Sequence, residues 1–177
     1  LGHSMASDIV IRQALSDPPG DVGVAVSMFS QAVTAADPVN LLAVAGAWEA
    51  RLAEEALRVL RLMDPDAELG QTVGDPSQGT GRRAVTAPMV EHVGVLYSAT
   101  SMTEARAWLD SVFGRSSSDP VPVRGGWIAL LLLATVALGW PLARSLPRFE
   151  VARAQPSNRG FWFAVVCPAI VTPLVLS

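Results

Sequence analysis

The sequence predicts an α/β fold, with a parallel sheet and flanking helices, followed by one or two transmembrane helices. Two observations indicate the sheet: residues 22–29 and 40–46 are short apolar runs bounded by turn residues, and amphipathic segments lie around them. A third observation indicates the membrane part. Hydrophobic residues make up 50% of the chain and charged residues 16%, against roughly 25% charged in soluble domains, and the apolar excess lies after residue 126.

The first elements are a helix and two buried strands. Residues 4–16 place apolar side chains at helical spacing, and the run Asp17–Gly20, with its two prolines, ends that pattern. The runs 22–29 and 40–46 then predict two strands, and the segment between them is too long for a hairpin. We therefore expect these strands to be parallel.

A second helix and a third strand follow. Residues 48–63 are amphipathic, with Glu54 and Arg58 at i,i+4, where they can pair. Residues 74–81 are rich in Gly, Asp and Thr and predict a hairpin loop, and residues 82–90 predict the third strand.

A closing helix over residues 103–113 completes the predicted domain. Four apolar residues fall on one face of this helix: Ala105, Trp108, Leu109 and Val112. The helix has N-cap candidates among residues 100–104, and Gly114 is a natural C-terminal cap.

The remainder of the chain is predicted to enter a membrane. Residues 127–146 contain an apolar run without charge until Arg144, and with Gly125 and Gly126 it approaches the roughly 20 residues of a spanning helix. Trp127 and Trp140 lie where interfacial aromatic residues are expected; the alternative is a buried core helix. We expect these parts: a partial α/β domain (1–114), a linker (115–125), a transmembrane helix (126–146), an Arg-rich loop (147–160) and a second, truncated transmembrane helix (161–177).

Charge and cysteine content exclude several classes of partner and cofactor. The net charge is −3, all thirteen basic residues are Arg, and no basic stripe is interleaved with aromatic residues, so we expect no nucleic-acid partner. The lone Cys167 cannot form an intrachain disulfide. With two histidines far apart and no CxxC pair, we expect no metal and no cofactor.

The segment Gly2-His3-Ser4-Met5-Ala6 matches a nucleophile elbow, a sharp turn from strand into helix that exposes a serine. The strained turn needs small residues two positions before and after the serine, and Gly2 and Ala6 satisfy this. At the start of a helix, the Met5 N–H can serve as an oxyanion donor. The pattern is weak alone, since Ser4 could be an ordinary N-cap.

An acid and a histidine follow Ser4 in the order used by serine hydrolases. Glu49 comes three residues after the second predicted strand, and His92 comes after the third. Glu49 could instead be a first-turn acid favoured by the helix dipole, and His92 a loop histidine without a role. The rival acids are Glu54, Glu55, Asp64 and Asp66.

With these pieces, residues 1–114 resemble the C-terminal half of the α/β-hydrolase fold. The resemblance rests on residues 1–6, 27–30, 40–49 and 90–95. It implies a Ser4–His92–Glu49 triad with Met5 N–H in the oxyanion hole. It also implies that the family's earlier strands and second oxyanion donor lie upstream, so we expect an incomplete chain that is inactive alone.

The function implied by the resemblance is hydrolysis of an ester or a related, lipid-like acyl compound by a membrane-anchored serine hydrolase. Two alternatives remain: a non-catalytic membrane-anchored binding protein, and an acyltransferase on the same scaffold. We expect the hydrolase domain outside the cytoplasm. The segment between the apolar runs holds four arginines, against two before the first run, and short Arg-rich loops stay in the cytoplasm.

Overall fold

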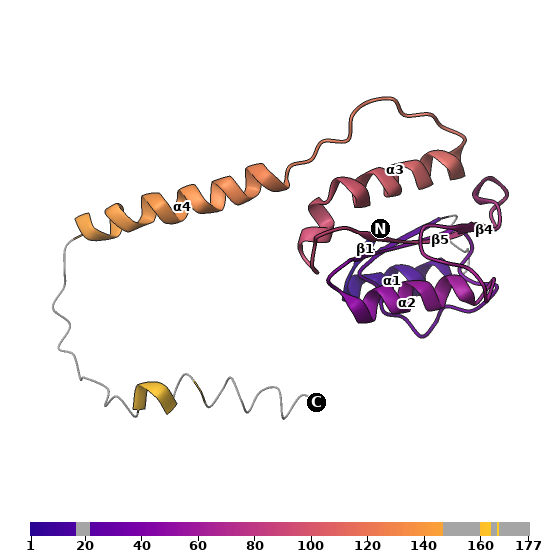
Figure 1. Cartoon of the computed structure of the whole chain (residues 1–177), viewed down its shortest axis with the longest axis horizontal. Helices are drawn as coiled ribbons and strands as arrows, with labels where there is room; N and C mark the ends of the chain where they lie inside the picture. The colour runs from indigo at the N-terminus through magenta and orange to yellow at the C-terminus, as the bar shows by residue number, and fades with distance from the viewer. Residues whose placement is uncertain (17–21, 147–159, 164–165, 167–177) are drawn as a thin grey trace. The chain divides into compact units, whose positions relative to one another are not determined.

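The computed structural model describes residues 1–16, 22–146, 160–163 and 166 (Figure 1). The chain divides into two compact units, residues 1–133 and 134–177. The first unit holds a five-stranded sheet made of β1 (Gly2–His3), β2 (Gly23–Val26), β3 (Leu41–Gly46), β4 (Thr72–Val73) and β5 (Arg82–Ala87). The helices around this sheet are α1 (Met5–Ala14), α2 (Ala50–Arg61) and α3 (Ala99–Phe113), with short 3₁₀ turns η1 (Pro76–Gln78) and η2 (Gly94–Tyr97).

The sheet has the order β1-β2-β3-β5-β4. The first four of these strands are parallel, in agreement with the sequence-based prediction. The fifth, β4, is antiparallel to β5 and was not expected. Residues 74–81 join β4 to β5, so the predicted hairpin loop is confirmed, and the sheet is mixed at this edge.

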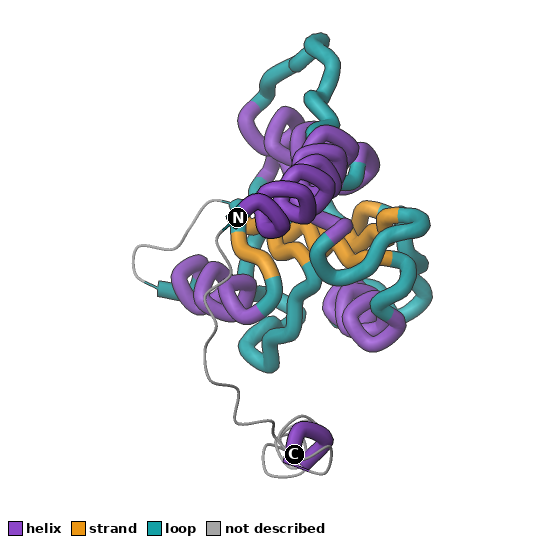
Figure 2. The backbone as a smooth tube through the Cα atoms, turned by 90° about the vertical axis from the view of Figure 1, so that its left-hand side faces the viewer, coloured by secondary structure: helices purple, strands orange, loops and turns teal. Residues whose placement is uncertain are grey.

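Helices cover both faces of the sheet. Figures 1 and 2 show α1 and α2 on one face and α3 on the other. The alternation of side chains along β3 explains the two cores: Leu41 and Ala43 pack toward the α1 and α2 side with Ile11 and Leu60, and Leu42 and Val44 pack toward Trp108 of α3. Both faces of β3 are therefore buried, which accounts for its continuous apolar run.

Several predicted details of the helices and strands were wrong. Arg58 pairs with Glu55 at 2.7 Å, three residues back, and not with Glu54. The amphipathic pattern of residues 48–63 predicts a solvent-exposed Glu55, but Glu55 is buried. The strand predicted over residues 22–29 stops at Val26, because Ser27 adopts a φ of 48° that a strand cannot continue.

The closing helix also differs from the prediction. It begins at Ala99, four residues before the predicted start, with Ser98 as its N-cap residue. Of its predicted apolar face, Trp108 is buried, whereas Leu109 is exposed. Its end is as expected, since Gly114 adopts the left-handed conformation of a C-terminal cap.

The helix α4 (Gly125–Ser145) is long and apolar enough to cross a membrane, by length and composition. None of its apolar stretch is buried, unlike a core helix of a soluble domain. Near its end, the Arg144 guanidinium lies 4.9 Å from the centre of the Trp140 ring. Most of the predicted Arg-rich loop (147–160) and of the second transmembrane helix (161–177) lies outside the described residues.

Candidate active site

Ser4 lies in a sharp turn between β1 and α1, and its backbone is strained. Its φ is 55° and its ψ is −128°, a conformation that non-glycine residues rarely adopt and that costs about 1–3 kcal/mol. The Ser4 N–H donates to the Val26 carbonyl at 2.9 Å, which ties the turn to β2. The turn thus holds Ser4 at the carboxyl end of β1 and at the N-terminus of α1.

Gly2 permits the close approach of β1 and α1 that this turn requires. A Cβ atom at Gly2 would lie 2.4 Å from the Ala6 carbonyl oxygen and 2.8 Å from the Val10 side chain. Both distances are too short for non-bonded carbon, so a larger residue would force the helix away from the strand. The need for a small residue two positions before Ser4 therefore has a steric cause.

The Met5 N–H is available beside Ser4. The first N–H groups of a helix have no partner inside that helix, and among the described residues no acceptor bonds to the Met5 N–H. The partial positive charge of the α1 N-terminus favours an anion at the same place. An oxygen that becomes negative next to Ser4 could accept this hydrogen bond.

Glu49 turns its carboxylate away from α2, although it is the N-cap residue of that helix. It makes no capping hydrogen bond. One oxygen, Oε2, accepts from the Gly46 N–H and the Ser27 hydroxyl, both at 2.7 Å, and the other, Oε1, lies 2.5 Å from Nδ1 of His92. The side chain is only 6% exposed. This arrangement differs from that of an acid placed to stabilise a helix dipole.

Two opposing effects set the pKa of the Glu49 carboxyl. Burial is the largest single effect and raises the pKa, because desolvation disfavours the charged form. The hydrogen bonds from Ser27, Gly46 and His92 stabilise the carboxylate and together outweigh burial, so the pKa lies below its ordinary value. Glu49 is therefore ionised at neutral pH and acts as a hydrogen-bond acceptor.

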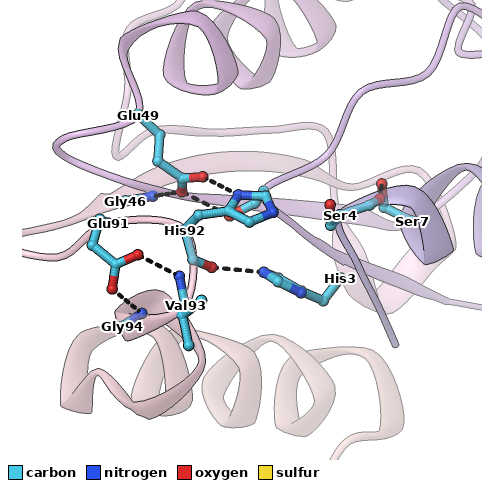
Figure 3. Close-up of polar contacts among 10 residues, drawn as sticks. His3, Ser4, Ser7, Gly46, Glu49, Glu91, His92, Val93 and Gly94 are labelled. Atoms are coloured by element: carbon cyan, nitrogen blue, oxygen red, sulfur yellow. Dashed lines mark hydrogen bonds and ion pairs between the residues drawn. The ribbon is translucent and has the colours of Figure 1, made fainter. Parts of the chain in front are cut away.

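His92 lies in the loop after β5, with its ring between Glu49 and Ser4 (Figure 3). Because the Glu49 carboxylate can only accept a hydrogen bond, Nδ1 of His92 carries a proton and donates the hydrogen bond. In neutral imidazole, Nε2 is then left free to accept a proton. No hydrogen bond joins the Ser4 hydroxyl to the ring among the described residues, and such bonds are often long without substrate.

The other predicted acids contact groups other than His92. Glu55 pairs with Arg58, and Asp64 accepts from the Asp66 N–H at 3.1 Å. Glu91, next to His92 in the chain, folds onto its own loop and accepts from the N–H groups of the two residues after His92, Val93 and Gly94 (Figure 3). These two hydrogen bonds lower the pKa of the Glu91 carboxyl. Glu49 is thus the acid that contacts the His92 ring.

A groove of about 440 Å³ lies beside Ser4 and His92. Apolar and polar side chains share its remaining lining: Met5, Asp8, Arg12, Ser27, Phe29, Ser30, Gln31 and Leu52. Met5 and Phe29 are largely exposed, so they offer apolar surface to a ligand. Asp8 bonds to Arg12 at 2.7 Å and to the Ser30 hydroxyl, and both contacts lower the pKa of its carboxyl.

Two residues near the site could not be assigned from the sequence. The sequence places Ser27 within the predicted strand 22–29 and His3 within the elbow segment, without a role for either side chain. In the structure, Ser27 donates to Glu49 and Nε2 of His3 lies 2.8 Å from the His92 carbonyl oxygen. The positive φ of Ser27 turns its hydroxyl toward the acid, and no sequence pattern reports such a φ for serine.

Comparisons with protein-family models, with curated proteins and with solved structures found no match to this chain. Any functional interpretation of the site therefore depends on its own geometry: the Ser4 turn, the Glu49–His92 pair and the parallel strand order. Within the described part of the chain, no three His, Cys, Asp or Glu side chains are grouped as metal ligands.

Proposed function

We propose that this chain carries the catalytic triad of a serine hydrolase of the α/β-hydrolase type, with Ser4 as nucleophile, His92 as base and Glu49 as acid. The observation that supports this most is the hydrogen-bonded Glu49–His92 pair beside a strained serine. Ser4 follows β1, Glu49 follows β3 and His92 follows β5. Because these strands are parallel, all three residues lie at the same edge of the sheet, where α/β proteins bind their ligands.

The proposed reaction is acyl transfer from an ester to Ser4 and then to water. Nε2 of His92 takes the Ser4 proton while Oγ bonds to the substrate carbonyl carbon, and the carbonyl oxygen gains the electron pair. The Met5 N–H donates to that oxygen, and Glu49 stabilises the imidazolium. The C–O bond of the ester then breaks, and the alcohol leaves with the proton from Nε2. Water repeats the sequence, which releases the acid and restores Ser4.

A carboxylic ester or a related lipid-like acyl compound is the substrate class that fits the groove. Met5 and Phe29 provide apolar surface next to Ser4, which suits the hydrocarbon part of an acyl group. Ser27 and Gln31 add polar groups to the same lining.

A fluorophosphonate probe, which labels activated serines, tests this proposal on the full-length protein. We expect Ser4→Ala to abolish labelling and His92→Ala to reduce it by about 10³-fold or more. The matched control is Ser16→Ala, because Ser16 follows the same helix and, among the described residues, hydrogen-bonds only to Gln13. Labelling that persists in Ser4→Ala would remove Ser4 from the mechanism.

We also propose that α4 anchors the catalytic unit in a membrane, with that unit outside the cytoplasm. The length and apolar composition of α4 support the anchor. The orientation is supported by arginines: Arg144, Arg148, Arg153 and Arg159 follow the apolar run of α4, whereas Arg115 and Arg124 precede it. Arginines in short loops favour the cytoplasmic side.

A further inference from the structure

His3 connects the segment that holds Ser4 to the segment that holds His92. Its Nε2 lies 2.8 Å from the His92 carbonyl oxygen, a contact between residues 89 positions apart. The two imidazole rings also lie close, with centroids 4.7 Å apart and planes inclined by 44°. Figure 3 shows His3 on the same side of the His92 backbone as Ser4.

His3 is held in place by the sheet. It pairs with Val26 in the parallel β1–β2 ladder, and the next residue, Ser4, donates its N–H to the Val26 carbonyl. The backbone of His3 is therefore fixed relative to the nucleophile. A hydrogen bond from its side chain can transmit that fixed position to a partner.

Apart from the hydrogen bond between its ring and Glu49, His92 is restrained mainly through its neighbours in the loop. β5 ends at Ala87, and the residues from there to η2 form neither helix nor strand. The Trp48 N–H donates to the Val90 carbonyl, and Glu91 accepts from the two N–H groups after His92. These contacts lie on either side of His92, whose side chain is 43% exposed. The contact from His3, in contrast, restrains the carbonyl group of His92 itself.

We propose that His3 is a positioning residue, whose Nε2–H donates to the His92 carbonyl and sets the distance between the imidazole and Ser4. A carbonyl oxygen can only accept, so Nε2 of His3 carries the proton in this contact. Glu49 fixes the tautomer and tilt of the His92 ring, and His3 fixes the backbone from which that ring extends. This inference rests on the proposed triad, because the position matters only if His92 serves Ser4.

Two amide variants of different reach test this role. Glutamine places its amide N–H near the position of Nε2 in histidine, whereas asparagine is too short. We expect His3→Asn to lower the maximal rate of fluorophosphonate labelling by about 10-fold, because a small misplacement of a catalytic group is costly. The probe concentration for half-maximal rate should change little. His3→Gln should label within about 2-fold of the wild type.

An NMR measurement, which does not require the protein to react, distinguishes failure of this inference from failure of the proposed function. The NMR signal of the His92 Nδ1 proton, which is hydrogen-bonded to Glu49, should shift in His3→Asn and return in His3→Gln. Equal labelling rates and equal His92 signals in the two variants, with equal melting temperatures, would overturn the positioning role. If the full-length wild type is not labelled, the proposed function fails, and the His92 signal alone decides whether His3 positions this residue.

Discussion

The Ser27 hydroxyl donates a 2.7 Å hydrogen bond to Oε2 of Glu49, the carboxylate oxygen that does not contact His92. Ser27 is 1% exposed and has a φ of 48°. Its N–H donates to the Val44 carbonyl at 2.6 Å, so the residue is fixed to β3. The acid of the proposed triad is therefore restrained by a neighbouring strand end as well as by its own loop.

Ser27→Ala should weaken the acid without removing it. Loss of a hydrogen bond to a charged group costs about 1.5–3 kcal/mol, and we expect fluorophosphonate labelling to slow by about 10-fold. The pKa of the Glu49 carboxyl should rise, because Ser27 contributes to lowering it. Ser101→Ala is a suitable control, since it removes a buried hydroxyl from α3, far from Glu49 in sequence. Equal labelling by Ser27→Ala and the wild type would contradict this role.

Glu49→Gln should reduce labelling by about 10²-fold, less than the loss of about 10³-fold or more expected for His92→Ala, because the acid is often the least costly triad member to lose. The matched control is Glu54→Gln, an exposed acid of α2. If Asp64→Asn were the damaging change instead, the assignment of Glu49 would be wrong.

The stability of the protein in acid should also depend on Glu49. Its pKa in the folded state lies below the ordinary value of 4.5, so its ionised form stabilises the fold above that value. This contribution disappears as the pH falls from 4.5 through the lowered pKa. Urea unfolding measured between pH 7 and pH 3 should therefore show a smaller acid-induced loss for Glu49→Gln than for the wild type. Equal losses in the variant and the wild type would indicate that the pKa of Glu49 is the same in the folded and unfolded states.

Gly2→Ala should disrupt the turn at Ser4. Its Cβ would overlap the Ala6 carbonyl, which belongs to the helix backbone and cannot rotate away. We expect a loss of about 1–3 kcal/mol of stability and a loss of fluorophosphonate labelling. Gly126→Ala is the control, because nothing lies within 4 Å of a Cβ at that position. Normal labelling by Gly2→Ala would show that the turn tolerates a wider separation of β1 and α1.

The fold was predictable where one local pattern decided the structure. The apolar run 40–46 became β3 because both faces of that strand are covered, and Gly114 ended α3 as a left-handed cap. The sharp turn at Ser4 was predictable because it requires small residues two positions before and after the serine, and Gly2 and Ala6 are visible in the sequence. The order of the chain predicts Glu49 and His92 as partners, and the structure places their side chains in contact.

Other features depend on contacts between distant segments, which no local pattern records. The contact between His3 and His92 spans 89 positions. The antiparallel strand β4 is only two residues long, too short for a periodicity. Arg82 begins a predicted strand, yet its charged side chain is 1% exposed, which reverses the usual placement of arginine.

Arg82→Met should destabilise the domain. The guanidinium donates to three carbonyl oxygens, those of Thr34, Pro38 and Val59, and the substitution leaves all three without this partner. Burial lowers the pKa of the guanidinium, and the nearby Asp37 opposes that shift. We expect urea unfolding to show a loss of about 3–5 kcal/mol. Arg51→Met on the exposed side of α2 should change stability by less than about 0.5 kcal/mol.

The orientation in the membrane can be tested with protease on intact spheroplasts. Arg144, Arg148, Arg153 and Arg159 follow the apolar run of α4, with Glu150 as the one acid between them. Acids contribute little to the positive-inside bias, so these arginines should hold this segment in the cytoplasm. External protease should then digest residues 1–114 and spare residues 144–159. The control is the same digestion after lysis, which should remove both. Digestion of residues 144–159 in intact spheroplasts, with residues 1–114 protected, would reverse the proposed orientation and place the Ser4 groove in the cytoplasm.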